Sequence, residues 1–461
     1  RGIPENMQVP HIEPSPHDAS VAYIVFDNHR QSDSNTYVYR VEQYGRRWIS
    51  LGSKDLRGHA YSVKQDPVDA DLLFLGTVFG LFVTLDGGDN WFRWTQGVPA
   101  SSVRDIAIQT RESDLVVATH GRGIFIIDDY GALRNLAEKD FSGRMMLLSV
   151  TDGQQYRSKR TNGDRLGEYR APNEPYGAMI TFMLSGSNLP KPETVTDTNT
   201  EDGNVDGKFV ATVKISNADG RVIRMFEANV HQGINRVVWD MGLEKIRQYP
   251  SERQPSAQPG PPPRSSVHAL PGRYSFTVSF EQEEIGGMVS VLTDPRFDIA
   301  VEDRQANFDA LMQVADLQER NVTAIERIRD ARRDAEHFLM LAMRRDGTAG
   351  MSGDGAHEDL SRLANEMNQA LDEIEYRLWS KPGTVEETAP TWNLAYFKIT
   401  KVMTHIGSHW GRPTQGNLRN IIDAQNAVQE AEQELGRVMA NEVAAFRNKA
   451  AEMNLDMKVT Q

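Results

Sequence analysis

The residues that could carry chemistry gather in one short stretch of the chain. Asp105 opens an apolar run, and His120 and Arg122 lie in the glycine-flanked turn after the next run. A carboxylate such as Asp105 could serve glycoside hydrolysis, which needs a second carboxylate about 5 Å or about 7–9 Å away. The same three residues could instead stabilise the turn through hydrogen bonds. We take Asp105, His120 and Arg122 as candidate catalytic residues and leave the second carboxylate open.

Patterns that could bind a metal ion are few. The chain has no cysteine, which excludes disulfides, thiolate metal sites and a cysteine nucleophile. His405 and His409 are four residues apart and could share a metal ion, but no third ligand lies nearby in the sequence. An EF-hand loop starting at Asp197 would need Gly sixth and Glu twelfth, where Asp202 and Lys208 stand. We expect no metal site and no cofactor, with calcium at the acidic segment as the alternative.

Composition limits the class of protein. The 461 residues are 39% hydrophobic and 25% charged, which is typical of a globular chain of several domains. A net charge of −13 disfavours a nucleic-acid partner, because such a partner requires a basic surface. No run of about 18 apolar residues occurs, so we expect no helix that spans a membrane.

Residues 1–137 contain a repeat. Short apolar runs alternate with Gly, Asp and Asn turns, and Trp48 and Trp91 end two copies 43 positions apart. The three copies comprise runs 21–26 and 37–39, runs 72–75 and 81–83, and runs 104–108, 115–119 and 124–127. Short strands at this period predict propeller blades of four antiparallel strands. The sequence therefore predicts about three blades of a β-propeller.

The sharpest motif in the repeat is a turn. Thr84, Asp86, Gly88 and Trp91 match the pattern Ser/Thr-x-Asp-x-Gly-x-x-Trp, known as the Asp box. Asp86 can accept backbone N–H groups at a tight turn, Gly88 can adopt a positive φ, and Trp91 can pack between blades.

A degenerate copy of this motif carries Gln43, Gly45 and Trp48. Both copies lie in register with the strand pattern. Carbohydrate chemistry is one reading of the motif, and a determinant of hairpin structure is the other. We favour the structural reading.

These repeats, with the stretch 103–129, resemble bacterial exported proteins with Asp-box (BNR) repeats, described as sortilin-like or as glycosyl hydrolases. The resemblance extends along the whole chain. Sialidases and xyloglucanases share the repeat, and so does sortilin, which is a receptor rather than an enzyme. The resemblance therefore implies a fold and an extracytoplasmic location (periplasm, cell surface or medium), but no activity.

Three blades are too few for a ring, because closed propellers use about four to eight. Open strand edges would be left exposed at both ends. We expect further blades, N-terminal in a longer precursor or on another chain, to complete the propeller.

The remainder predicts two other kinds of structure. We expect residues 138–175 to form a connector and residues 176–298 to form an immunoglobulin-like β-sandwich. Within the sandwich, we expect a hairpin turn at 217–220 and a mobile Pro/Ser-rich loop at 250–266. From residue 301 the apolar period changes from 2 to 3.6, which predicts a helical bundle over 301–461. Its last helix should begin near Thr414. The apolar stripes could form the bundle core or a docking surface.

Two functions remain open. The first is an exported, non-enzymatic scaffold that binds a protein or glycan ligand. The second is a glycoside hydrolase acting on polysaccharide at the propeller face, with Asp105 as one carboxylate. We favour the scaffold, because the sequence shows neither a catalytic triad nor a metal motif.

Overall fold

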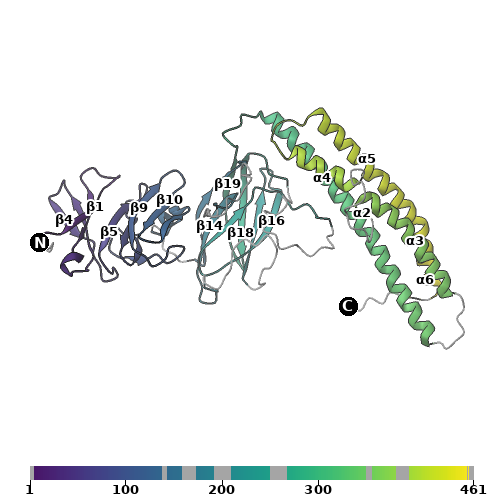
Figure 1. Cartoon of the computed structure of the whole chain (residues 1–461), viewed down its shortest axis with the longest axis horizontal. Helices are drawn as coiled ribbons and strands as arrows, with labels where there is room; N and C mark the ends of the chain where they lie inside the picture. The colour runs from purple at the N-terminus through teal and green to yellow at the C-terminus, as the bar shows by residue number, and fades with distance from the viewer. Residues whose placement is uncertain are drawn as a thin grey trace. The chain divides into compact units, whose positions relative to one another are not determined.

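The computed structural model describes residues 5–137, 143–157, 173–191, 209–249, 267–348, 356–379, 394–453 and 455 (Figure 1). The chain separates into two compact units, Arg1–Asp240 with Gly272–Leu292 and Met241–Pro271 with Thr293–Gln461. Most of the predicted connector, the acidic segment 197–203 and the loop 250–266 lie outside the described residues. The predicted domain boundaries stay predictions.

The first unit opens with three antiparallel sheets, purple to blue in Figure 1. The first holds β1 (Gln8–Pro14), β2 (Ala22–Asp27), β3 (Tyr37–Glu42) and β4 (Arg47–Ser50), with η1 (His29–Gln31) between β2 and β3. The second holds β5 (Ala60–Gln65), β6 (Leu73–Thr77), β7 (Gly80–Thr84) and β8 (Phe92–Arg93). The third holds β9 (Val103–Gln109), β10 (Asp114–Thr119) and β11 (Gly123–Ile127), followed by η2 (Tyr130–Leu133) and α1 (Arg134–Ala137).

Each sheet is ordered as a blade. The strands follow one another in chain order from β1, β5 and β9, and these three first strands neighbour one another from sheet to sheet. The sheets therefore stand side by side along their inner strands, which is the arrangement of a partial propeller. We call them the first, second and third blades.

Apolar side chains fill the space between neighbouring blades. One core lies between the first and second blades and includes Val25, Val38, Phe82 and Trp91. Another lies between the second and third blades and contains the following buried side chains: Leu72, Phe74, Leu81, Val83, Leu115, Val117 and Tyr130. Successive residues of a strand point to opposite faces of its sheet. In the second blade, alternate residues therefore point toward the first blade, and the residues between them point toward the third blade.

Two further sheets complete the first unit. One has the order β12 (Met145–Thr151), β14 (Ala178–Leu184) and β17 (Gly233–Trp239). The other has the order β13 (Gly153–Gln154), β19 (Glu283–Leu292), β18 (Gly272–Phe280), β15 (Val210–Ser216) and β16 (Val222–Asn229), with β13 parallel to β19.

Side chains tie the third blade to the β12 sheet. Arg236 donates to the backbone carbonyl of Asp129 at 2.7 Å, and the Ser149 hydroxyl donates to the Asp129 carboxylate at 2.9 Å. The predicted hairpin joins β15 to β16 through the turn at Asn217, whose side-chain oxygen accepts the backbone N–H of Arg221 at 2.9 Å. The immunoglobulin-like character of these sheets stays a prediction.

The second unit is helical. It contains α2 (Val301–Thr348), α3 (Ala356–Leu378), α4 (Ala395–Ile406), α5 (Gln415–Val438), the π-helix η5 (Met439–Val443) and α6 (Ala444–Glu452). The stripe with 3.6 periodicity becomes one buried core, with Leu371, Val428 and Leu435 fully enclosed. Thr414 caps α5 by accepting the backbone N–H of Asn417 at 3.1 Å.

Residues 241–249 belong to this unit, since Arg247 pairs with Glu319 at 2.6 Å and with Glu326 at 2.7 Å on α2. Among the described residues, no helix has both the length and the apolarity needed to cross a membrane.

Candidate functional site

The three predicted catalytic residues lie at one end of the third blade. Asp105 is exposed on β9 and accepts the backbone N–H of Ile106 at 2.9 Å. His120 follows β10, where its backbone N–H donates to the Ser102 carbonyl at 2.8 Å, and Arg122 is exposed in the next turn. Within the part of the chain that the structure describes, no hydrogen bond or ion pair joins their three side chains. Their catalytic role stays a prediction.

The turn at 84–91 is held by its own polar side chains. Asp86 accepts the backbone N–H of Asn90 at 2.9 Å and the Thr84 hydroxyl at 2.7 Å, and Thr84 accepts the N–H of Gly88 at 3.1 Å. Burial opposes ionisation of Asp86, but these bonds outweigh it and hold its pKa below the usual value. Gly88 has φ 106°, which disfavours any other residue.

The two repeat tryptophans differ in their surroundings. Trp91 is 3% exposed and donates from Nε1 to the Leu51 carbonyl of the first blade at 3.0 Å. Trp48 holds the equivalent repeat position, but it is 45% exposed and donates only to Gly45 in its own turn, at 3.0 Å. Trp91 thus lies in the joint between two blades, whereas Trp48 packs only on aromatic side chains of its own blade among the described residues.

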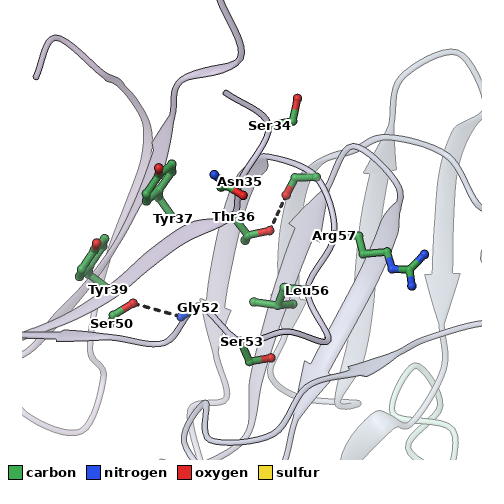
Figure 2. A pocket seen from close by; sticks show the side chains of 11 residues that line it. Ser34, Asn35, Thr36, Tyr37, Tyr39, Ser50, Gly52, Ser53, Leu56 and Arg57 are labelled. Atoms are coloured by element: carbon green, nitrogen blue, oxygen red, sulfur yellow. Dashed lines mark hydrogen bonds between the residues drawn. The ribbon is translucent and has the colours of Figure 1, made fainter. Parts of the chain in front are cut away.

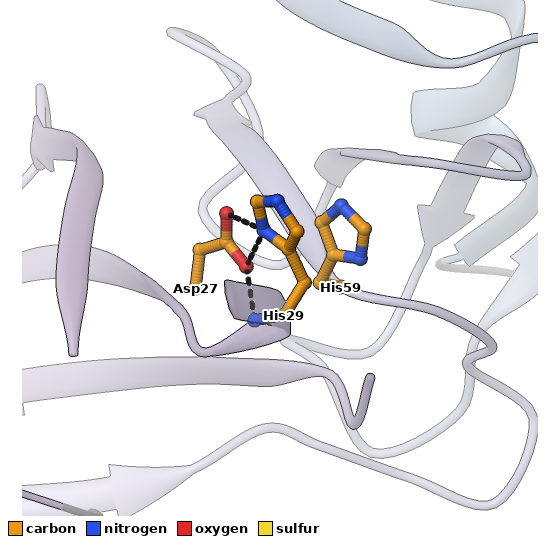
Figure 3. Close-up of side chains that lie close together, drawn as sticks. All are labelled: Asp27, His29 and His59. Carbon is orange, nitrogen blue, oxygen red and sulfur yellow. Dashed lines mark hydrogen bonds and ion pairs between the residues drawn. The ribbon is translucent and has the colours of Figure 1, made fainter. Parts of the chain in front are cut away.

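A string of polar side chains crosses the three blades at the ends of β2, β5 and β9. The Asp27 carboxylate contacts His29 Nδ1 at 2.7 Å, and the His29 and His59 rings stack with centroids 4.5 Å apart. Figure 3 shows the His29 ring between the Asp27 carboxylate and the His59 ring. His59 Nε2 contacts the Tyr61 hydroxyl at 2.6 Å, and the Arg104 guanidinium lies 3.8 Å above the Tyr61 ring.

The burial of this string is uneven. Asp27 and His59 are 5% and 8% exposed, whereas His29 is open to solvent. The Nδ1 atom of His59 is buried and has no hydrogen-bond partner among the described residues. Burial lowers the pKa of His59; the charge of Asp27 acts in the opposite direction, and His29 and Arg104 add to the lowering. Burial therefore favours the neutral form of the His59 imidazole.

The β2–β3 loop and the segment between β4 and β5 line a hollow. The hollow has a volume of about 450 Å³, and Figure 2 shows Thr36, Tyr37, Tyr39 and Arg57 around it. The Thr36 hydroxyl donates to the Gly58 carbonyl, which joins the β2–β3 loop to the segment before β5. The lining is polar, so the hollow suits a polar ligand.

Burial also affects two aspartates of the blades, Asp66 and Asp128, with opposite results for their pKa values. Asp66 is fully buried; it accepts Arg134 through both oxygens, at 2.8 and 3.1 Å, and the Tyr130 hydroxyl at 2.6 Å. Burial opposes ionisation of Asp66, but these donors outweigh it and lower its pKa. In contrast, burial and then the charge of Asp114 raise the pKa of Asp128, with Arg236 opposing them.

The sequence analysis did not single out Asp27, His29 or His59. His59 is 30 positions from His29, too far for a short local motif to join them. The only local signal was an Asp-x-His sequence at the end of an apolar run. His405 and His409, which the sequence did single out, lie at the end of α4 and just after it. Within the described residues, Asp27, His29 and His59 form the one group of three potential metal ligands whose ligand atoms all lie within 4.8 Å of one another.

Comparisons with known proteins found remote likenesses. No protein-family model matches the chain, and no curated protein matches it. Two GH74 enzymes are similar over 51% of this chain: a xyloglucanase from Xanthomonas campestris (12% identity, TM-score 0.23, 39% of its length) and an enzyme from Niastella koreensis (13%, 0.24, 38%). The extracellular domain of a proposed one-component system from B. thetaiotaomicron is similar over 63% of this chain (12%, 0.21, 30%). The chain spans well under half the length of each, and likeness at this level assigns no activity.

Proposed function

We propose that this chain is an exported, non-enzymatic binding scaffold whose propeller is completed by further Asp-box blades packed on its two outer faces. The observation that carries this proposal is the contrast between Trp48 and Trp91. Both close the same turn of the repeat, yet in the described part of the chain only Trp91 has a preceding blade to cover it. A blade placed before the first one would bury Trp48 as the first blade buries Trp91.

The outer face of the first blade has the chemistry of a blade joint. Val25 and Val38 are paired across β2 and β3 and point into the core shared with the second blade. The adjacent pair, Ile24 and Tyr39, therefore points to the opposite, outer face. There, Tyr39 and Phe26 each lie within 6.2 Å of the Trp48 ring. Ile12 extends this apolar face and is exposed.

The outer face of the third blade matches it. Leu115 and Val117 point into the core shared with the second blade, so their neighbours face outward. Ile124 and Ile126 on that outward face are 70% and 62% exposed. Isoleucines this exposed on an outer strand face are an aggregation hazard in a monomer. Covering both faces with blades removes the hazard and closes the ring.

The occupant that fits both faces is a blade of the same repeat. This chain shows the packing twice, between the first and second blades and between the second and third. We therefore place the partner among polypeptides with Asp-box turns, on a longer precursor or on a second chain. The hollow beside Thr36 and Tyr37 would then bind a protein or glycan ligand, and the sheets from β12 to β19 would form the immunoglobulin-like module of an extracytoplasmic protein.

A glycoside hydrolase is the second candidate, and Asp128 is the observation that favours it. Its raised pKa is what a general acid needs in glycoside cleavage. The test is release of reducing sugar from a panel of soluble polysaccharides by the completed assembly. The control is Asp152, an exposed carboxylate that accepts the backbone N–H of Ser290 at 2.7 Å. Activity that Asp128→Asn abolishes and Asp152→Asn leaves intact would favour the enzyme over the scaffold.

The scaffold proposal is tested by oxidative footprinting of the isolated chain and of the protein purified from its native source. We expect Trp48 to be oxidised in the isolated chain and protected in the native assembly, which should contain Asp-box sequence outside these 461 residues. Trp91 should be protected in both samples, and Tyr44, which is highly exposed in its turn, should react in both. Equal oxidation of Trp48 in the two samples would overturn the proposal.

A further inference from the structure

The cluster at the ends of β2 and β5 offers two nitrogen donors and one oxygen donor. One ligand atom each from Asp27, His29 and His59 lies within 4.8 Å of the other two. We propose that these three residues bind one divalent transition-metal ion, and that zinc suits them best. Zinc is commonly held by imidazole nitrogen and carboxylate oxygen, with water in a remaining position. This site is independent of how the propeller is completed.

The unpartnered nitrogen of His59 is the observation that points to a ligand. A ring nitrogen that is buried without a hydrogen bond costs free energy, because it has lost its contact with water. His59 is 8% exposed, and its Nδ1 has no partner among the described residues. A metal ion would satisfy that lone pair.

The other nitrogen of His59 already has the support expected of a metal ligand. Metal-bound histidines donate their second N–H to an oxygen, which sets the tautomer and the ring orientation. His59 Nε2 lies 2.6 Å from the Tyr61 hydroxyl, and Arg104 stacks on the Tyr61 ring. If Nε2 carries the proton and donates it to Tyr61, Nδ1 keeps its lone pair for the metal.

The remaining two ligands can close around an ion. In a tetrahedral zinc site, donor atoms are about 3.4 Å apart, given bonds of about 2.1 Å. The largest separation, at most 4.8 Å, must therefore shrink by up to about 1.4 Å, whereas Asp27 and His29 Nδ1, now 2.7 Å apart, must separate slightly to admit the ion. Asp27 is buried and is oriented by the backbone N–H of His29 at 3.0 Å. The side chain of His29 is 39% exposed, so its ring can turn without disturbing the core.

Metal titration of the untagged full chain, freed of metal by a chelator, tests this proposal. We expect one Zn²⁺ per chain in competition with a chromophoric indicator, and visible absorption typical of four-coordinate Co²⁺ when Co²⁺ replaces zinc. His29→Ala, an exposed change that should not disturb folding, is expected to weaken binding more than about 100-fold. Tyr61→Phe should weaken it about 10- to 100-fold, since it removes only the supporting oxygen.

His17→Ala and His337→Ala are the matched controls, because both histidines are exposed and lie outside the cluster. They should bind Zn²⁺ as the unmodified chain does. The proposal is overturned if the chain binds no Zn²⁺, if His29→Ala binds it as tightly as the parent, or if the control variants lose affinity equally. Circular dichroism of each variant establishes that a loss of binding is not a loss of folding.

Discussion

Replacing the two repeat tryptophans with alanine should separate a filled blade joint from an open one. Trp91 is almost completely buried and Trp48 is 45% exposed. A buried Trp removes up to about 250 Å² from water, which at about 25 cal/mol per Å² gives about 6 kcal/mol as an upper bound. Observed Trp→Ala losses in cores are about 3–5 kcal/mol. We expect that loss for Trp91→Ala and about half of it for Trp48→Ala.

Hydrogen exchange read by mass spectrometry is the suitable assay, because a chain with two compact units is not expected to unfold in a single step. The readout is protection of peptides from β2, β3, β5 and β6. A difference of about 2 kcal/mol between the variants corresponds to about thirtyfold in protection. Tyr44→Ala, in the same turn as Trp48, should change nothing. Equal losses for Trp48→Ala and Trp91→Ala would refute the assignment of an open joint to the first blade.

Three further predictions concern other parts of the fold. Asp66→Asn breaks the buried pair with Arg134 and should destabilise the blades by about 3–5 kcal/mol. Because folding lowers the pKa of Asp66, the ionised carboxylate stabilises the fold above its unfolded pKa of about 3.9, and this stabilisation is lost as the pH falls below that value. The free energy of unfolding should therefore depend less on pH in the acid range for the variant than for the parent chain. Gly88→Ala should lower the free energy of unfolding by more than about 1 kcal/mol, measured by thermal unfolding, because φ is 106° and a Cβ would lie 3.0 Å from the Leu51 side chain. The control Gly436→Ala adds a Cβ where α5 has open space, so it should leave stability unchanged or raise it. Thr414→Ala removes the cap of α5 and should lower protection of that helix by about 1 kcal/mol in hydrogen exchange. The control Thr404→Ala, in the last turn of α4, loses only a bond to the Thr400 carbonyl and should leave the protection of α5 unchanged.

Local pattern was enough to predict the broad architecture. The period of two in runs such as 21–26 and the Gly and Asp turns between them predicted the blades, because alternation and turn chemistry act over a few residues. The change to a period of 3.6 after residue 301 predicted the helical region, and Thr414 marked the start of α5. The partial propeller and the helical region are confirmed in the structure.

Packing between blades settled what the local pattern left open. His59 meets Asp27 and His29 because β5 of the second blade lies beside β1 and β2 of the first, and no spacing rule encodes that juxtaposition. Trp48 and Trp91 have the same place in the repeat, and their exposure differs because, among the described residues, a neighbouring blade covers Trp91 but not Trp48. Burial depends on what covers a side chain, and residues distant in sequence supply that cover.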